Sequence, residues 1–224
     1  MSPVAHPSSF RDPSGQVFTK NGIIYRQINQ SYKDDYDKLI ASGLHGQLVN
    51  LRLLIKSEEV DFPPPWPENA YKVIRPEMIP FISYPYEWSF SQLKAAALTT
   101  LEIQRIALEH GLSLKDASAY NIQFLRGRPL LIDTLSFVRY DETEPWVAYR
   151  QFCQHFLGPL ALMSHKDIRL GGMLRLYIDG IPLDLVNKLL PLKAYTRLSL
   201  LLHIRLHARS QRRFSGRPEA VAHN

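Results

Sequence analysis

The spacing of apolar residues predicts alternating strands and helices in the first part of this chain. Residues 16–19 and 23–28 are apolar runs joined by Lys20-Asn21-Gly22, and Asn-Gly at such a place is the strongest short-range signal of a β-hairpin. The next apolar positions recur with helical spacing, at Tyr36, Leu39, Ile40 and Leu44. We therefore expect a hairpin that leads into a helix.

Short strands and one long helix are expected next. Residues 71–74 and 78–84 are predicted strands, and Pro76 and Pro80 restrict at least one of them to a sheet edge. Residues 90–110 have the clearest helical pattern, which ends at Gly111 and has an apolar stripe of Leu93, Ala96, Ala97, Leu101 and Leu108. Helical spacing continues after residue 137, so the second half is expected to be mainly helical.

Three oxygen-bearing side chains, Asp116, Asn121 and Asp133, lie between the long helix and the helical half. Two apolar runs around residues 126–129 predict a second hairpin there. The three side chains would project from one end of that hairpin, and such oxygens are the ligands that Mg²⁺ prefers. The alternative is ordinary turn chemistry, in which Asp and Asn bond to nearby backbone.

Composition and charge narrow the class of protein. The 224 residues are 45% hydrophobic, which is enough for a globular core. A net charge of +6 suggests an anionic partner, such as nucleotide phosphates, nucleic acid, a membrane surface or an acidic protein. Five arginines gather near the end, namely Arg205, Arg209, Arg212, Arg213 and Arg217. The basic face of a helix here would be exposed to solvent or would dock a partner, and the alternative is binding to a membrane surface or to nucleic acid.

The single cysteine, Cys153, cannot form an internal disulfide, and its simplest interpretation is a buried thiol in a reducing compartment. The sequence shows neither the apolar core of a signal peptide nor a run of about 20 apolar residues. We therefore expect a cytoplasmic protein without a transmembrane segment.

The order of these elements, together with two motifs, resembles a protein-kinase-like fold. Leu114-Lys115-Asp116 with Asn121 has the D-x-x-x-x-N spacing of the catalytic loop, and Ile132-Asp133-Thr134 lies where that family has D-F-G. The resemblance implies an α+β, two-lobed protein with a small β-rich N-lobe and a mainly helical C-lobe. The corresponding boundaries are a flexible arm at 1–14, an N-lobe at 15–86, a C-lobe at 87–210 and a basic tail or linker at 211–224.

The resemblance also implies roles for individual residues. Asp116 would accept the proton of an attacking hydroxyl, or orient that hydroxyl. Asn121 and Asp133 would hold Mg²⁺ on ATP. Apart from the resemblance, Lys115 beside Asp116 is a candidate phosphate contact, because its ammonium would help to neutralise the transferring charge, and the alternative is a solvated loop lysine.

The chain departs from the kinase pattern in its first half. It has no G-x-G-x-x-G and no V-A-I-K strand, and Arg26 stands nearest to the position of the missing lysine. Its expected ion-pair partner is Asp34, Asp35 or Asp37, and the alternative is a surface ion pair. Tyr86 and Glu87, in a predicted crossing segment, are candidates for a nucleotide pocket, with packing between the lobes as the alternative.

A second resemblance covers nearly the whole chain. The runs R-Q-I-N, P-F-I-S-Y-P-Y-E-W, L-K-D-A-S-A-Y-N and W-V-A-Y-R-Q-F-C-Q-H-F resemble a kinase-like segment found upstream of class I S-adenosylmethionine-dependent methyltransferase domains in bacterial proteins. No acidic G-x-G-x-G turn occurs, so no S-adenosylmethionine site is expected in this chain. The sequence thus supports two hypotheses: an ATP-dependent phosphotransferase that binds a Mg-nucleotide, and an inactive pseudokinase or scaffold associated with a methyltransferase.

Overall fold

The structure, a computed structural model, describes Val4, Ala5 and residues 12–206. Contacts divide the described chain into two compact units. The first holds the residues up to Ser83 together with Leu98–Asp116 and Asn121–Val147, and the second holds Tyr84–Ala97, Ala117–Tyr120 and the residues from Ala148 onward. The boundaries of the two lobes remain a prediction, and the basic tail at 211–224 lies outside the described residues.

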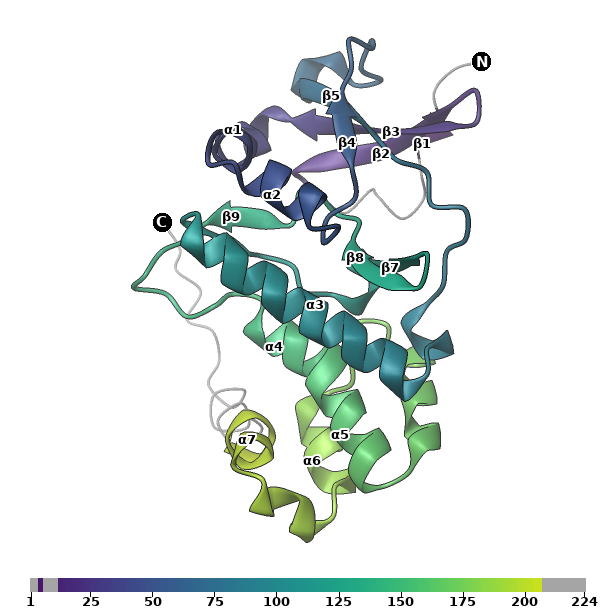
Figure 1. Ribbon diagram of the computed structural model, residues 1–224, viewed down its shortest axis with the longest axis vertical. Coiled ribbons are helices and arrows are strands. Elements are labelled where there is room, and N and C mark those ends of the chain that lie inside the picture. Colours follow the sequence, from purple (N-terminus) through teal and green to yellow (C-terminus); the bar gives the residue numbers. More distant parts are fainter. Residues whose placement is uncertain (1–3, 6–11, 207–224) are drawn as a thin grey trace, which may run out of the picture. The chain divides into compact units, whose positions relative to one another are not determined.

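A five-stranded antiparallel sheet forms the N-terminal part of the first unit (Figure 1). Its strands are β1 (Val4–Ala5), β2 (Gly15–Lys20), β3 (Ile23–Asn29), β4 (Ser57–Glu59) and β5 (Ala70–Pro76), in the order β1-β2-β3-β5-β4. Asn21 and Gly22 have φ values of 53° and 77°, which a tight hairpin turn of this handedness requires. The predicted first hairpin is confirmed. At one edge, the short strand β4 exposes Glu58 and Glu59.

The helices after β3 complete the main core of this sheet. A short η2 (Gln30–Tyr32) leads into α1 (Lys33–Ala41), and α2 (Leu44–Asn50) lies beside α1 (Figure 1). The buried cluster joins the sheet, the helical segment and a residue from much later in the chain: Ile28, Tyr32, Tyr36, Ile74 and Leu135. The strand β3 therefore presents Ile28 to a core that also fixes the residues around Asp133.

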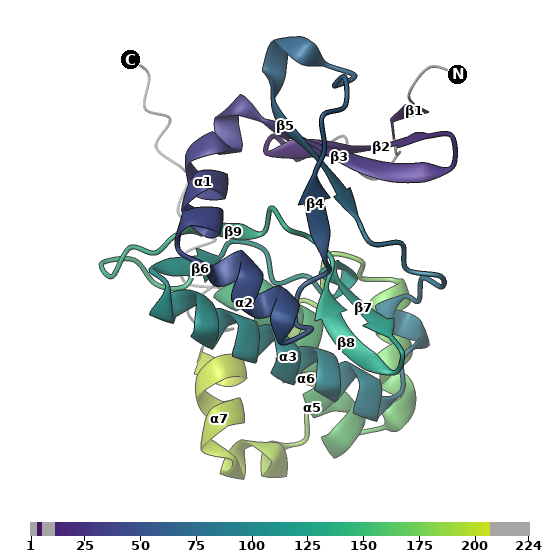
Figure 2. The same cartoon turned by 45° about the horizontal axis from the view of Figure 1, so that its top comes forward.

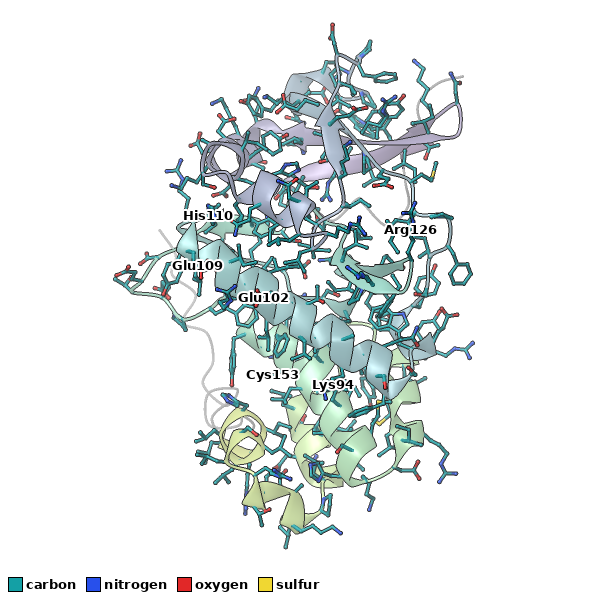
Figure 3. The ribbon with its side chains drawn as sticks, in the orientation of Figure 1. Lys94, Glu102, Glu109, His110, Arg126 and Cys153 are labelled. Atoms are coloured by element: carbon teal, nitrogen blue, oxygen red, sulfur yellow. The ribbon has the colours of Figure 1, made fainter. Side chains whose placement is uncertain are left out.

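The second predicted hairpin is confirmed as β7 (Ile122–Leu125) and β8 (Arg128–Leu131), with Arg126 at the turn (Figure 3). Arg128 and Pro129, which the sequence assigned to the turn, belong to β8, because Arg126 and Gly127 alone reverse the chain at φ values of 52° and 76°. The segment that precedes β4 lies beside β8 (Figure 2). Ile55 N there donates to Leu131 O at 2.8 Å. A small two-stranded sheet of β6 (Leu112–Leu114) and β9 (Phe137–Arg139) flanks the loops on both sides of the hairpin.

The long helix is confirmed as α3 (Phe90–Glu109). The strand predicted at 71–74 is part of β5, but the one predicted at 78–84 is wrong, because these residues form no strand. Pro80 has no N–H to donate to a ladder, and Ser83 pairs its backbone with the side chain of Gln123 instead, at 3.0 and 2.9 Å.

The second unit is helical after residue 148. Its elements are η4 (Pro85–Glu87), α4 (Tyr149–Phe152), η6 (Cys153–Leu157), α5 (Gly158–His165), η7 (Ile168–Arg175), α6 (Leu183–Leu189), η8 (Leu192–Thr196), α7 (Leu198–Leu200) and η9 (Leu201–Leu206). Among the described residues there are also the short helices η3 (Pro67–Asn69) and η5 (Ala119–Asn121). The α+β class, with a sheet-rich N-terminal region and a helical C-terminal part, is confirmed. Within residues 12–206, none of the helices has both the length and the apolar character that a membrane span needs.

Candidate functional site

Arg26 and Asp133 form an ion pair at the middle of the first unit. Arg26 lies on β3, and its Nη1 donates to Asp133 Oδ1, while its Nη2 donates to Asp12 Oδ2 at 2.8 Å. The side chains of Arg26 and Asp133 are only 13% and 16% exposed. Arg26 was expected to pair with Asp34, Asp35 or Asp37, and this expectation is wrong, because the guanidinium is held between two carboxylates from other loops.

Asp133 follows β8 and is bound on both carboxylate oxygens. Its Oδ1 accepts a second hydrogen bond from Leu135 N at 2.9 Å, and its Oδ2 accepts one from Ser136 Oγ at 2.8 Å. Burial would raise the pKa of Asp133, but the Arg26 guanidinium and the hydrogen bonds from Ser136 and Leu135 outweigh it and lower that pKa below its ordinary value. Asp133 is therefore an anion at neutral pH.

Lys115 lies next to this pair. Its backbone N donates to Ser136 O at 2.8 Å, which ties the loop after β6 to the loop after β8. Its Nζ donates to Ser14 Oγ at 2.6 Å and lies 4.4 Å from the centre of the Tyr32 ring. We call the group of Asp12, Ser14, Arg26, Lys115 and Asp133 the polar centre.

Residues 12–14, which we call the strap, connect the two cations of the polar centre. Asp12 Oδ1 accepts from Ser14 N at 2.9 Å, so the same carboxylate closes a local turn and binds Arg26. The sequence interpretation missed Asp12 and Ser14, which it placed in a flexible arm. The signal that could have found them is Asp-Pro-Ser-Gly directly before a strand, a turn-forming combination.

Asp116 and Asn121 are close to the polar centre along the chain. Asp116 directly follows Lys115 and is half-buried. Asn121 ends η5, and its backbone O accepts from Ile132 N at 2.8 Å, which makes the backbones of Asn121 and Asp133 neighbours. The Nδ2 atom of Asn121 is buried and has no hydrogen-bond partner among the described residues. Asn121 thus has a buried amide donor directly before the hairpin that no described group satisfies.

Tyr86 and Glu87 belong to the second unit, in η4. Glu87 Oε2 accepts from Tyr84 N at 2.7 Å, and the rings of Tyr84 and Tyr86 are stacked with their centres 5.5 Å apart. These contacts stabilise the turn before α3. A nucleotide-binding role for Tyr86 and Glu87 remains a prediction.

The polar centre is poorly suited to a bound Mg²⁺ while Arg26 binds Asp133. A carboxylate has about four acceptor positions, and Asp133 uses three of them for Arg26, Leu135 and Ser136. A cation at the fourth would face the guanidinium, and two unit charges about 4 Å apart repel by about 4 kcal/mol at an effective dielectric constant of about 20. A divalent ion would double that repulsion, so Arg26 weakens metal binding at Asp133.

The fold and the site define an α+β protein with a sheet-rich N-terminal region, a helical C-terminal part and a polar centre in which an arginine binds two carboxylates. No protein-family model matches the chain. The nodulation protein NoeA of Rhizobium meliloti (strain 1021) is 37% identical over 210 residues, which are 91% of this chain and 43% of that protein. Among solved structures, the PK-1 kinase of the Cydia pomonella granulovirus is similar over 92% of this chain and 89% of its own, with 13% identity and a TM-score of 0.48. The chain spans less than half the length of NoeA, so this similarity does not by itself assign the activity or the partners of NoeA to this chain.

Proposed function

We propose that this chain is a non-catalytic kinase-like module that serves as a companion of an S-adenosylmethionine-dependent methyltransferase. One observation carries the first part of the proposal. The side chain expected to hold the metal, Asp133, is instead bound by Arg26.

The physical reason is that phosphoryl transfer depends on metal ions that neutralise the charge of the transferring group. Arg26 supplies one positive charge to Asp133 but also binds Asp12, so the guanidinium is neutralised by two carboxylates. Such a group has no charge left over for a nucleotide phosphate. In this module, the pair of Arg26 and Asp133 acts as a structural link between β3 and the loop after β8.

The methyltransferase part of the proposal comes from the sequence. The segments that this chain resembles precede methyltransferase domains, and NoeA has more than half of its length outside the matched region. S-adenosylmethionine would be bound by the companion domain. The residues of this chain would then provide a docking surface and no chemistry.

A turnover assay tests the non-catalytic role. Wild-type protein and Asp116→Ala are incubated with ATP and MgCl₂, and ADP release is measured with a small-molecule or a protein acceptor present. We expect the same background rate for both proteins. Release of ADP by the wild type that Asp116→Ala abolishes would overturn the proposal.

The companion role has a separate test. The chain is mixed with a methyltransferase domain of the kind that such segments precede, and the mixture is separated by size-exclusion chromatography. Co-elution, together with a change in methyl transfer to the domain's own acceptor, is expected. Separate elution with unchanged methyl transfer would contradict the companion role.

The second candidate function is a Mg-nucleotide-binding phosphotransferase with Asp116 as base, Lys115 at the phosphates, and Asn121 and Asp133 at the metal. The unpaired Asn121 amide favours it. Rotation of the side-chain amide by half a turn would put its carbonyl oxygen where Nδ2 now lies, and a carbonyl oxygen is a ligand type suited to Mg²⁺. A thermal-shift titration separates the two candidates. A ligand at 100 times its Kd stabilises a protein by about 2.7 kcal/mol, so the second function requires that millimolar Mg-ATP raise the melting temperature more than ATP without magnesium does, and an unchanged melting temperature would contradict it.

A further inference from the structure

Two side chains of the strap bind the two cationic side chains of the polar centre. Asp12 gives a carboxylate to Arg26, and Ser14 gives a hydroxyl to Lys115. A carboxylate and a hydroxyl are also what an anionic ligand would present to the same two side chains. The strap therefore has the chemistry of a bound ligand, although it is covalently part of the fold.

The position of the strap is specified by several contacts of its own. Pro13 O accepts from Asn29 Nδ2 at 3.1 Å and from Ser31 Oγ at 2.8 Å, and Ser14 O accepts from Asn29 N at 2.9 Å. Gly15, which follows, has no room for a side chain, because a Cβ would lie 2.3 Å from Gln27 O and 2.7 Å from Leu135 Cδ1. Hydrogen bonds and close packing thus fix the position of the strap.

The charges of the polar centre balance only while the strap is seated. Arg26 and Lys115 carry two positive charges, and Asp12 and Asp133 carry two negative charges. Removal of Asp12 from this set leaves an excess of one positive charge in a region where side chains are mostly buried. An excess charge there attracts an anion more strongly than it would at the surface, because screening by water is weaker.

We propose that the strap is an autoinhibitory segment that keeps the polar centre closed, and that a phosphate-bearing ligand reaches Arg26 and Lys115 only when it displaces Asp12 and Ser14. This inference rests on the proposed function, since it names what holds the centre closed. It does not depend on whether the opened centre is catalytic. A tethered group competes at a high effective concentration. The apparent affinity for a free anion is therefore the affinity of the open centre multiplied by the fraction of molecules in which the strap has left the two cations.

Isothermal titration with inorganic pyrophosphate in magnesium-free buffer tests the inference. Asp12→Asn keeps the size of the side chain and removes its charge, and it is expected to bind pyrophosphate about tenfold more tightly than the wild type, or by about 1.4 kcal/mol. Asp61→Asn is the matched control, because Asp61 is an exposed aspartate of the same unit outside the polar centre, and its affinity should equal that of the wild type. Adenosine, which has no phosphate, should bind no better to Asp12→Asn than to the wild type.

Two further variants keep the test decisive. Asp12→Asn/Lys115→Gln should lose the gain in affinity, because the anion then lacks one of its two cations. If Asp12→Asn does not give the urea midpoint and near-ultraviolet circular dichroism of a folded protein, Ser14→Ala carries the test, since it frees Lys115 alone and should increase pyrophosphate affinity about threefold. Equal affinity for the folded strap variants and for Asp61→Asn would overturn the autoinhibitory role. That result leaves the turnover assay unaffected, so failure of the strap and failure of the proposed function are distinguishable.

Discussion

Lys115 and Ser14 are 101 residues apart in the sequence, yet the lysine Nζ donates to the serine Oγ at 2.6 Å. This bond, together with the pairing of Arg26 with Asp12 and Asp133, makes the residues before β2 part of the polar centre. Five predictions rest on the contacts around it and on the buried groups elsewhere in the described residues.

Gly15→Ala is expected to destabilise the protein by about 1–3 kcal/mol, because the added methyl group would overlap the backbone O of Gln27, which cannot move without disturbing β3. The measurement is urea denaturation followed by circular dichroism. Gly46→Ala is the control, since a Cβ at Gly46 in α2 meets nothing within 4 Å, and the helix should become slightly more stable. Equal stability of the two variants would show that the strap is not closely seated.

Arg26→Met should lower the free energy of unfolding at pH 7 by about 3–5 kcal/mol, because it leaves Asp133 charged, mostly buried and without its cation. Arg105→Met is the control, since the ion pairs of Arg105 with Glu102 and Glu109 lie on the exposed side of α3 (Figure 3), and stability should hardly change.

The effect of Arg26→Met should depend on pH in one direction. The pKa of Asp133 is lower in the folded protein than in the unfolded chain, so its stabilising contribution is complete above the unfolded value of about 3.9 and is lost as the pH falls through the folded value. Without Arg26, burial raises the pKa of Asp133, so the variant takes up its proton at a higher pH than the wild type, and the difference between the two proteins should shrink on acidification. A difference that grows on acidification would contradict the assignment of Arg26 as the partner of Asp133.

Tyr32→Phe should cost about 1–2 kcal/mol of stability. The Tyr32 hydroxyl is buried and bonds to the backbone of Phe137, donating to its O and accepting from its N at 3.2 Å, and phenylalanine leaves both groups of the strand unpaired. Tyr140→Phe, at an exposed position, should have almost no effect in the same denaturation experiment. Burial also raises the pKa of Tyr32, so its absorbance should not titrate with that of the exposed tyrosines.

Cys153 should react slowly with a thiol reagent in the native protein and rapidly in urea. It is the free cysteine of η6 with only 1% of its surface exposed, and burial raises the pKa of its thiol, which lowers the fraction of reactive thiolate. The rate of reaction with Ellman's reagent measures this. A native rate close to the rate in urea would show that the second unit opens readily.

The parts of the fold that depend on neighbouring residues were predictable from the sequence. The turns at Asn21-Gly22 and Arg126-Gly127 specify both hairpins locally, and the long helix follows from its own helical spacing. Its expected apolar stripe is only partly right, because Leu101 and Leu108 are exposed. The strand expected at 78–84 failed because alternating apolar residues do not reveal whether a partner strand is present.

The polar centre was predictable only in part. Arg26, Lys115 and Asp133 were recognisable as a set from the resemblance, but the partners of Arg26 were not, since Asp133 is 107 residues away and Asp12 lies in a region of loop composition. Pairing between residues so far apart in the sequence depends on tertiary packing, which the local pattern of a single sequence does not reveal. The roles of Asp116, Asn121, Tyr86 and Glu87 stay predictions.

The strand β4 also bears on whether a second molecule could extend this sheet. A sheet edge offers unpaired backbone groups to any other extended chain, and long apolar edges invite aggregation. Here the edge is three residues long, and its two glutamates are engaged by the next strand, Glu58 with Arg75 and Glu59 with Lys72 at 2.6 Å. An approaching strand would have to face these carboxylates, so this edge of the sheet is poorly suited to extension by a second molecule.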